Sequence, residues 1–361
     1  MMFKLSMVGV TFHLMIAGVS VVSMKAFSDS SIERAHKLVT LMNWHSAKPL
    51  PVALQEVYPA EFKGRIYVAG AFEKVKPAQA TLAHLAASEK TYIYDDMTKE
   101  WLIGPNLPEP RHHLGLVSNN NMLYAIGGFD ASKENAWMVK NSVYIYQEDS
   151  FKWRRGPDLP IPQGESVYGV VNDEVHVAGG RTLVDGQLVD TDKHWVLRNK
   201  KWESAAPLPL ASNSAASVTL DNEWYVMGGR INALDYKNLA TMHRYDPIAD
   251  RWVKLAPMPQ ASAGLAAAVI NDQIYVFGGE EYTYVYDENN QKRMKTRTFD
   301  SVWRYDIKRD MWSTESLKMT STRHGLGAVT IDNKIYLLGG AVEAGATGTS
   351  ANVEILSLER L

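Results

Sequence analysis

The side chains best suited to bind or transform a ligand recur at fixed distances along this chain. Ten residues after five successive tryptophans, and eleven after a sixth, stand Leu54, Arg111, Gln163, Ser212, Ser262 and Arg323. The residues that directly follow six pairs of small residues are Phe72, Phe129, Arg181, Arg230, Glu280 and Ala341. Close to these two sets are Glu56, Tyr58, His112, His113, Glu165, Asn213, Glu281 and His324.

Guanidinium groups, carboxylates and imidazoles in one site would suit a polar or anionic small ligand, because arginine binds a carboxylate through two parallel hydrogen bonds. We therefore predict ligand-binding roles for Glu56, Arg111, His112, His113, Glu165, Arg181, Arg230, Arg323 and His324. A structural role is the alternative, since Glu165 and Arg181 could form an ion pair within one repeat. The histidines lack the fixed spacing of metal ligands, and we predict no metal site and no cofactor.

The tryptophans that set these distances belong to six copies of one unit. In five copies, proline follows tryptophan after seven residues: Trp44 and Pro51, Trp101 and Pro108, Trp153 and Pro160, Trp202 and Pro209, Trp252 and Pro259. Trp312 begins the sixth copy, in which Met319 replaces the proline. The pairs of small residues come 26 positions after the first five tryptophans and 27 after the last: Gly70-Ala71, Gly127-Gly128, Gly179-Gly180, Gly228-Gly229, Gly278-Gly279 and Gly339-Gly340. The tryptophans recur about every 50 residues. A repeat of roughly this length indicates a propeller rather than separate domains.

Each copy contains the signals of several short strands. Runs of branched and aromatic residues precede the small pairs, as at residues 66–68, 123–126, 224–226 and 335–338. An aromatic residue stands seven positions before the tryptophan in five copies: Tyr94, Tyr146, Trp195, Tyr245 and Tyr305. Asn and Asp residues that favour turns separate these runs. We predict that each copy forms a four-stranded antiparallel blade.

Glycine pairs that follow an apolar strand, with tyrosine and tryptophan at fixed spacing, resemble the Kelch repeat over residues 40–361. The resemblance implies an all-β, six-bladed Kelch propeller. It also implies that the loop before each innermost strand and the loop after each glycine pair open on one face, around a central channel. Arginine at the positions of Arg111 and Arg323 is common in Kelch repeats, which leaves a structural role open for both.

The last copy lacks its own tryptophan strand, because it ends near residues 352–356. Residues 44–51 repeat the closing strand of the other copies, so we predict that the N-terminal strand completes the last blade. The six tryptophans are interpreted as core between blades rather than as a sugar-stacking platform. The glycine pairs join strand to strand, which favours tight turns over a phosphate-binding loop.

Two repeats carry insertions, at residues 73–89 and 281–300, and insertions in repeat proteins often form loops on the binding face. The second insertion contains Tyr282, Tyr284 and Tyr286, followed by the basic residues Lys292, Arg293, Lys295 and Arg297. A solvated loop is the simpler interpretation of that basic run.

Two enzyme families share the implied fold. The copper site of galactose oxidase requires a cysteine, and this chain has none. The exported N-acetylneuraminate epimerases resemble this chain through Gly279-Glu280 and Arg297-Thr298-Phe299-Asp300. That resemblance implies catalytic roles for Glu280 as base and Arg297 as a clamp for the sugar carboxylate, since mutarotation needs only acid–base catalysis.

The composition and the N-terminal sequence indicate which partners and which location to expect. The 361 residues carry a formal net charge of −2, so we predict no nucleic-acid partner. Lys4 precedes an uncharged stretch from residue 5 to residue 24, which predicts a signal peptide over residues 1–26, a linker over 27–39, and a periplasmic or secreted protein. An uncleaved membrane anchor is the alternative.

Together these features predict a binding module for a glycan, an acidic sugar, another polar small ligand or a protein. A sugar mutarotase similar to N-acetylneuraminate epimerase is the alternative function.

Overall fold

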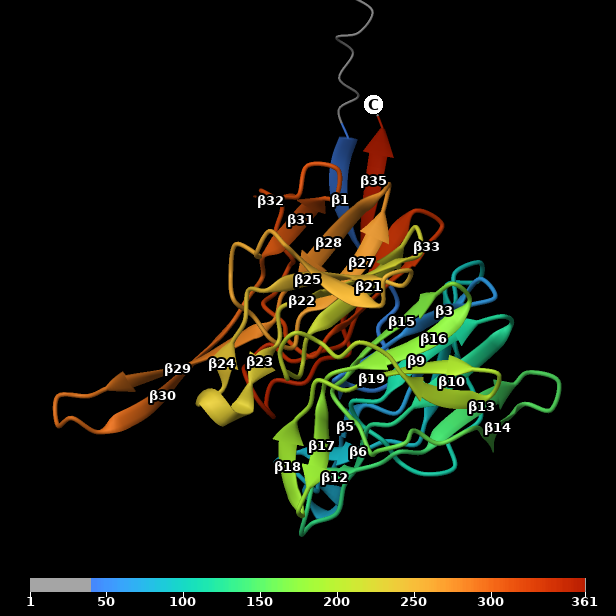
Figure 1. The fold of residues 1–361 in the computed structure, drawn as a ribbon, viewed down its shortest axis with the longest axis horizontal. Coiled ribbons are helices and arrows are strands. Elements are labelled where there is room, and N and C mark those ends of the chain that lie inside the picture. Colours follow the sequence, from blue (N-terminus) through green and yellow to red (C-terminus); the bar gives the residue numbers. More distant parts are fainter. Residues whose placement is uncertain (1–39, 361) are drawn as a thin grey trace, which may run out of the picture. The chain divides into compact units, whose positions relative to one another are not determined.

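The computed structural model describes residues 40–360, and the regular structure in this part is almost entirely β-strand (Figure 1). The two helices named in it are the short 3₁₀ turns η3 (Pro77–Gln79) and η4 (Asn232–Leu234). The predicted signal peptide at residues 1–26 and the predicted linker at 27–39 lie outside the described residues.

Six four-stranded antiparallel sheets account for most of the described strands. The first three sheets contain β3 (Ala60–Phe62), β4 (Arg65–Ala69), β7 (Thr91–Asp95) and β8 (Glu100–Ile103); β9 (Gly115–Asn119), β10 (Met122–Ile126), β13 (Val143–Gln147) and β14 (Lys152–Arg155); and β15 (Val167–Val171), β16 (Glu174–Ala178), β19 (His194–Arg198) and β20 (Lys201–Ser204). The other three contain β21 (Ala216–Leu220), β22 (Glu223–Met227), β25 (Met242–Asp246) and β26 (Arg251–Leu255); β27 (Ala266–Ile270), β28 (Gln273–Phe277), β31 (Val302–Asp306) and β32 (Met311–Thr314); and β33 (Gly327–Ile331), β34 (Lys334–Leu338), β35 (Val353–Arg360) and β1 (Thr40–Ser46).

The first strands of these sheets form a closed cycle. β3 contacts β9, β9 contacts β15, and the contacts continue through β21 and β27 to β33, which returns to β3. Each sheet is therefore a blade, and its first strand lies nearest the central channel. The predicted all-β propeller is confirmed.

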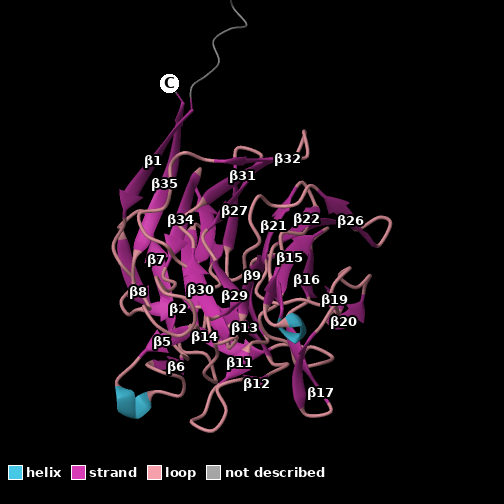
Figure 2. Cartoon of the chain, turned by 90° about the vertical axis from the view of Figure 1, so that its left-hand side faces the viewer, coloured by secondary structure: helices cyan, strands magenta, loops and turns pink. Residues whose placement is uncertain are grey.

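The N-terminal strand closes the last blade. β1 pairs with β35, the outermost strand that the C-terminal repeat supplies, and the two strands lie side by side in Figures 1 and 2. Beyond β1, the amide of Ala47 donates to the carbonyl of Val353 at 3.0 Å. This pairing covers an edge of β35 that would otherwise be free to pair with another chain.

Hydrophobic clusters fill the spaces between neighbouring blades, and the repeated tryptophans take part in them. The indole N–H of Trp202 donates to the carbonyl of Pro157 in the preceding blade at 2.8 Å, and that of Trp252 donates in the same way to Ala206 at 2.9 Å. The interpretation of these residues as inter-blade core therefore agrees with their contacts.

The glycine pairs allow two blades to approach closely. Gly127 and Gly128 both have a positive φ, and a Cβ on Gly127 would lie 2.2 Å from the carbonyl oxygen of Gln163 in the next blade. That carbonyl accepts a 2.8 Å hydrogen bond from the amide of Gly128. A side chain at Gly127 would break this contact between blades.

A second set of small sheets follows the small-residue pairs of the first five blades. These sheets contain β2 (Leu54–Gln55), β5 (Phe72–Lys74) and β6 (Leu85–Ala87); β11 (Phe129–Asp130) and β12 (Met138–Val139); β17 (Arg181–Val184) and β18 (Gln187–Asp190); β23 (Arg230–Ile231) and β24 (Lys237–Asn238); and β29 (Glu280–Tyr286) and β30 (Lys292–Thr298). Neighbouring hairpins touch, because β12 contacts β17, β18 contacts η4, and β24 contacts β29. We call this set the hairpin crown.

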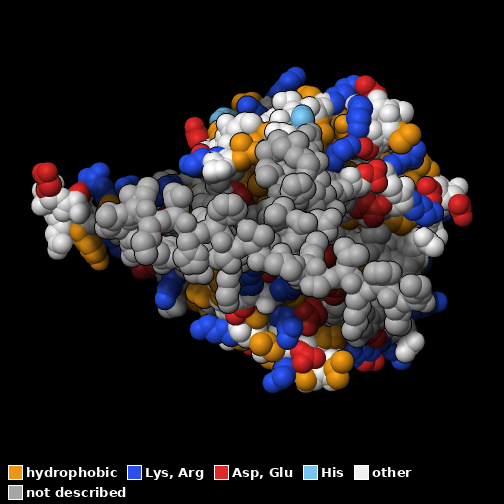
Figure 3. All heavy atoms as spheres, turned by 90° about the horizontal axis from the view of Figure 1, so that it is seen from above, with side chains coloured by type: hydrophobic (Ala, Val, Ile, Leu, Met, Phe, Trp, Pro, Cys, Tyr) orange, Lys and Arg blue, Asp and Glu red, His pale blue; other side chains and the backbone are white. Residues whose placement is uncertain are grey.

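The two predicted insertions form parts of the hairpin crown. Residues 73–89 contribute to β5, η3 and β6, whereas residues 281–300 form most of the long hairpin β29–β30, which extends outward in Figure 1. In the view of Figure 3, acidic and basic side chains are interspersed over the visible described surface. No helix in residues 40–360 has the length and apolar character needed to cross a membrane.

Candidate functional site

A ring of left-handed backbone positions surrounds one end of the channel. The residue at the same place in each blade, just before the innermost strand, has a φ between 51° and 61°: Glu56, His113, Glu165, Ser214, Gly264 and Gly325. Backbone hydrogen bonds link neighbouring blades here, from Glu165 N to His113 O (3.3 Å), Ser214 N to Glu165 O (3.2 Å), Gly264 N to Ser214 O (2.9 Å) and Gly325 N to Gly264 O (2.7 Å). These positions are thus fixed by the closed ring of blades.

A cavity of about 670 Å³ lies at this end, between the ring and the hairpin crown. Its volume falls in the range of small-molecule sites, roughly 300–1,000 Å³. The crown supplies most of its wall, and the ring supplies its floor. The residues that line it include Gln55, Glu56, Phe72, His113, Trp137, Glu165, Arg181, Leu188, Arg230, Asn232, Tyr236, Glu280, Tyr282, Tyr284, Met294, His324 and Gly345.

Ionisable side chains form a continuous network across the floor. Glu56 Oε2 lies 3.2 Å from Nε2 of His113, which lies 3.6 Å from Oε1 of Glu165. On the other side, Nδ1 of His324 lies 3.8 Å from Oε1 of Glu56 and 3.4 Å from Oε2 of Glu280. We call these five residues, Glu56, His113, Glu165, Glu280 and His324, the polar ring. All five are buried.

Two carboxylates of the polar ring are held in the ionised form. Burial alone raises the pKa of Glu56, but the facing His113, together with His324 and Arg230, outweighs this effect and holds the pKa at about 2. Burial also raises the pKa of Glu280, and His324 and Arg230 bring it below its ordinary value. The floor therefore keeps fixed negative charge at neutral pH, compensated by nearby cations.

Two arginines, at the first positions of β17 and β23, lie beside aromatic rings, and their carboxylate partners differ. Arg230 Nη1 lies 2.8 Å from Oε1 of Glu280, and its guanidinium sits 5.3 Å from the centre of the Tyr282 ring. Arg181 sits 5.8 Å from the centre of the Trp137 ring, but its nearest carboxylate oxygen, on Glu165, is 3.7 Å away. Arg230 therefore forms an ion pair with Glu280, whereas the N–H donors of Arg181 remain available to another group.

Several buried polar atoms in this cavity have no hydrogen-bond partner among the described residues. They are Oε2 of Glu165, Nε of Arg181, Oδ1 of Asn232 and Nδ1 of His324. Buried polar groups are normally paired, because an unpaired one costs about 1–3 kcal/mol. Four of the thirteen such atoms among the described residues belong to residues that line this cavity, where a polar molecule could offer them partners.

The structure brings most of the sequence-predicted site residues to this cavity. The residues of that set that line it are Glu56, His113, Glu165, Arg181, Arg230, His324 and Glu280. Glu165 and Arg181 also face each other, as the structural alternative anticipated, but at a distance that is too long for a hydrogen bond.

Arg111 and Arg323 lie elsewhere, inside their own blades. Nη1 of Arg323 donates to the carbonyl of Gly339 at 3.0 Å, and its Nη2 pairs with the buried Glu354. Arg111 donates to the hydroxyl of Ser142 at 2.6 Å and pairs with Glu109. Each side chain is thus held by partners in its own blade. Both residues are therefore left out of the candidate site.

His112 does not line the cavity either. Its ring stacks on Phe72 with 3.7 Å between centroids, and its Nε2 lies 2.8 Å from the carbonyl oxygen of Ala136. Burial and the neighbouring His113 keep the pKa of His112 well below its ordinary value. His112 thus supports the polar ring from behind, because its Nδ1 lies 2.6 Å from Nδ1 of His113, while its ring packs between Phe72 and Phe129.

The expected catalytic pair, Glu280 and Arg297, is not brought together. Glu280 is buried, and its Oε2 accepts hydrogen bonds from the hydroxyl of Tyr282 (3.0 Å) and the amide of Gly345 (2.9 Å). Arg297 is exposed on β30 and lies over the ring of Phe299. In the hairpin register Glu280 pairs with Thr298, so Arg297 belongs to the opposite face. Arg297 is therefore left out of the site.

Trp137 is the main cavity residue that the sequence reasoning missed. Its ring lies 5.4 Å from that of Phe129 and beneath Arg181. Trp137 falls outside the register of the six repeated tryptophans, but so do Trp195, Trp224 and Trp303, which lie on blade strands. Its register alone therefore did not distinguish it as a candidate for ligand contact.

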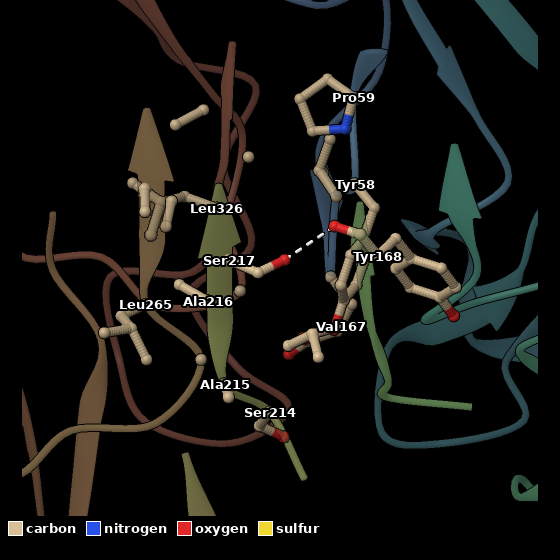
Figure 4. Close-up of a pocket in the computed structure, with 18 of the residues that line it drawn as sticks. Tyr58, Pro59, Val167, Tyr168, Ser214, Ala215, Ala216, Ser217, Leu265 and Leu326 are labelled. Atoms are coloured by element: carbon tan, nitrogen blue, oxygen red, sulfur yellow. Dashed lines mark hydrogen bonds between the residues drawn. The ribbon is translucent and has the colours of Figure 1, made fainter. Parts of the chain in front are cut away.

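The channel continues below the polar ring as a smaller cavity of about 130 Å³ (Figure 4). Small residues of the innermost strands line it, together with Tyr168 and Ser217 on those strands and Tyr58 in the segment before β3. Ser217 donates to the carbonyl of Tyr168 at 2.8 Å, which links two blades. Glu56 touches both cavities and separates them. Among residues 40–360, no cluster of three or more His, Asp or Glu side chains is arranged to hold a metal ion.

Comparison with known proteins identifies the repeat. A model described as the KLHDC2/KLHL20/DRC7 Kelch-repeats domain matches residues 60–279, and the Kelch motif matches residues 261–316. Curated relatives include Kelch-like protein terF of Aspergillus terreus, 26% identical over 212 residues, which are 57% of this chain and 44% of that protein. Kelch-like protein 15 of Mus musculus is 24% identical over 46% of this chain and 26% of its own length. The chain thus spans less than half the length of these relatives.

The solved structure of YjhT has a similar fold. It superposes with a TM-score of 0.69 and covers 87% of this chain and 99% of its own, with 17% sequence identity. At this identity the likeness concerns the fold alone.

Proposed function

This chain belongs to the Kelch-repeat family, and we propose that it binds a polar small molecule, specifically an acidic sugar, in the cavity above its polar ring. The observation that carries this proposal is the set of unpartnered buried polar atoms in the cavity, on Glu165, Arg181 and Asn232. A sugar offers hydroxyl groups that both donate and accept hydrogen bonds, which suits carboxylate, guanidinium and amide partners at once.

Arg181 is the proposed anchor for the acidic group of the ligand. Its guanidinium is held in place against Trp137 and has no hydrogen-bond partner among the side chains of residues 40–360. A carboxylate in the cavity would accept two parallel hydrogen bonds from it. Trp137 and Tyr282 would offer flat apolar surfaces to the ring of the sugar.

Calorimetric titration tests this proposal. The purified chain is titrated with N-acetylneuraminate, galacturonate and glucuronate, with neutral galactose for comparison. At least one acidic sugar should bind, and Arg181→Ala should weaken its binding roughly 10- to 100-fold, as expected for loss of a charge-assisted contact. Arg297→Ala, on the exposed face of the hairpin, is the matched control and should bind normally. Absence of binding to every acidic sugar would refute the proposal.

A sugar mutarotase is the second candidate, favoured by the free oxygen of one carboxylate. Oε2 of Glu165 is buried in the cavity without a hydrogen-bond partner, and its Oε1 lies beside His113. This carboxylate could take a proton from the anomeric hydroxyl and return it to the ring oxygen, which is the chemistry of anomer exchange. Anomer exchange followed by NMR should then be accelerated by the wild-type chain, and Glu165→Gln should remove the acceleration while retaining binding.

A protein partner is a further possibility, since Kelch-repeat domains generally bind proteins. The hairpin crown would be the surface for it, because residues such as Leu183 and Val184 are exposed there. We also propose export, on the basis of Lys4 and the uncharged stretch that follows it. Cell fractionation, with mass measurement of the mature chain, tests the location and the predicted cleavage.

A further inference from the structure

The β29–β30 hairpin presents a line of tyrosines on one of its faces. Tyr282, Tyr284 and Tyr286 occupy alternate positions of β29, and alternate residues of a strand share a face. On β30, Met294 pairs with Tyr284, and Lys292 pairs with Tyr286. We call Tyr282, Tyr284 and Tyr286 the tyrosine face.

The tyrosine face is continuous with the cavity. Tyr282, Tyr284 and Met294 line the cavity wall, and the strand begins at Glu280 in the polar ring. Exposure increases along the strand, from 1% at Glu280 to 66% at Tyr286. The same row of side chains thus runs from the buried floor into solvent, along the hairpin that extends outward in Figure 1.

We infer that the ligand is the end of a chain, namely an oligosaccharide of acidic sugars whose terminal unit occupies the cavity while the next units lie along the tyrosine face. This inference rests on the proposed function. It specifies that the ligand is a polymer end rather than a free monosaccharide.

Ring spacing and charge favour such a chain. Alternate residues of a strand are roughly 6.6–6.8 Å apart, so the three tyrosine rings offer successive separate contact surfaces along the hairpin. Lys292 lies over the Tyr284 ring at 4.0 Å from its centre, and Asp235 accepts only one of its three N–H groups, at 2.6 Å. A carboxylate on the second sugar could take another of those donors.

Packing within the hairpin does not account for Tyr286. Its side chain is 66% exposed and faces Lys292, so it contributes little to burial of apolar surface. The opposite face of the same hairpin carries Val285 among charged and polar residues, namely Glu281, Thr283, Arg293, Lys295 and Arg297, and no aromatic ring. The two faces therefore differ in chemistry, and the aromatic one is the face that reaches the cavity.

The test compares monomers with matching oligomers in calorimetric titrations of the full chain. Galacturonate is compared with its α1,4-linked tetramer, and N-acetylneuraminate with its α2,8-linked tetramer. One tetramer should bind at least about tenfold more tightly than its monomer. Tyr286→Ala should weaken the tetramer about two- to tenfold, as expected for loss of one aromatic contact, and leave the monomer unchanged. Tyr286→Phe, which keeps the ring, should retain the tetramer affinity.

Val285→Ala is the matched control, because Val285 is the exposed neighbour on the opposite face, and it should change neither affinity. Equal affinity for monomer and tetramer would overturn the inference while leaving the proposed function intact. Absence of binding to both would overturn the proposed function as well. Preferential binding of tetraglutamate, lost in Tyr286→Ala, would assign the tyrosine face to acidic peptides and would also overturn the inference.

Discussion

Arg323 and Glu354 form an ion pair that is almost completely buried within the last blade. Arg323 precedes β33, whereas Glu354 lies on β35, so the pair joins two strands on either side of β34. Burial lowers the pKa of Arg323, and Glu354 counteracts part of that effect. This pair explains why an arginine expected to contact ligand does not reach the cavity.

Arg323→Met should lower the free energy of unfolding by about 3–5 kcal/mol, because it leaves the Glu354 carboxylate buried without its partner. Urea denaturation measures this loss. The double change Arg323→Met with Glu354→Leu should recover most of it, since two apolar side chains of similar size remove both charges. Arg297→Met, at an exposed position, should have little effect. A stable Arg323→Met variant that no longer binds sugar would instead return Arg323 to the site.

The fold could be predicted from the sequence because each blade carries its own local signals. Tryptophan and glycine recur in every copy, and proline in five of the six, at nearly constant spacing, so a weak signal in one copy is supported by the others. Pairing of β1 with β35 was also predictable, because residues 44–51 repeat the strand that the last copy lacks. Residues 40–46 and 353–360, which are far apart in the sequence, pair because β1 has the pattern of the strand that the last blade lacks.

The site was less predictable, because the direction of a side chain depends on single-residue register. His113 enters the polar ring, but the adjacent His112 packs between aromatic rings. Thr298 shares the face of Glu280, whereas Arg297, one residue earlier, does not. Long side chains add a second uncertainty, since Arg323 bends back to the carbonyl of Gly339 in its own blade. Repeat alignment gives the position of a residue but not these directions.

Two buried histidines outside the site should make the protein sensitive to acid. His176 and His194 lie 2.8 Å apart between their ring nitrogens and pack against Trp224. Burial lowers the pKa of His176 to about 3 and that of His194 to about 4. Below pH 6.5 the unfolded chain therefore binds protons that the folded chain does not, and stability decreases as the pH falls toward these values.

Between pH 7 and pH 5 each of these histidines should reduce the free energy of unfolding by about 2 kcal/mol. Urea denaturation at both pH values measures the sum. NMR titration of the histidine ring protons provides a second measurement, in which both rings should stay neutral at pH 5. If either buried ring titrated near pH 6.5, its contribution to acid sensitivity would be absent.

Closure of the ring by β1 should be required for cooperative folding. Trp44 on β1 packs against the cluster that contains Phe277, with 6.2 Å between the ring centres. A chain that begins at residue 47 would lose this contact and expose the edge of β35. We expect it to unfold at lower urea concentration and to aggregate, since an exposed strand edge pairs with other chains.

A synthetic peptide of residues 40–50 should restore solubility and stability to that shortened chain, because it can add the missing strand. A peptide with the same residues in scrambled order is the matched control and should not do so. If the shortened chain were as stable and soluble as the full one, the closing role of β1 would be disproved.

Two glycines of the left-handed ring offer a paired test of the site. Gly325 has a φ of +57°, and a Cβ on it would lie 2.6 Å from Oε1 of Glu56. Gly264 has a φ of +61°, but the nearest atom to an added Cβ is 3.4 Å away. Alanine at either position should cost about 1–2 kcal/mol of stability for the left-handed backbone. Only Gly325→Ala should also displace the Glu56 carboxylate from His113 and His324.

Gly325→Ala should therefore weaken binding of the acidic sugar about tenfold or more, whereas Gly264→Ala should bind normally at the same modest cost in stability. Urea denaturation and calorimetric titration of both variants separate these effects. The comparison isolates Glu56 because the two variants share their backbone strain and differ in what the new methyl group meets. Equal losses of binding in both variants would mean that the left-handed backbone, rather than the position of Glu56, determines affinity.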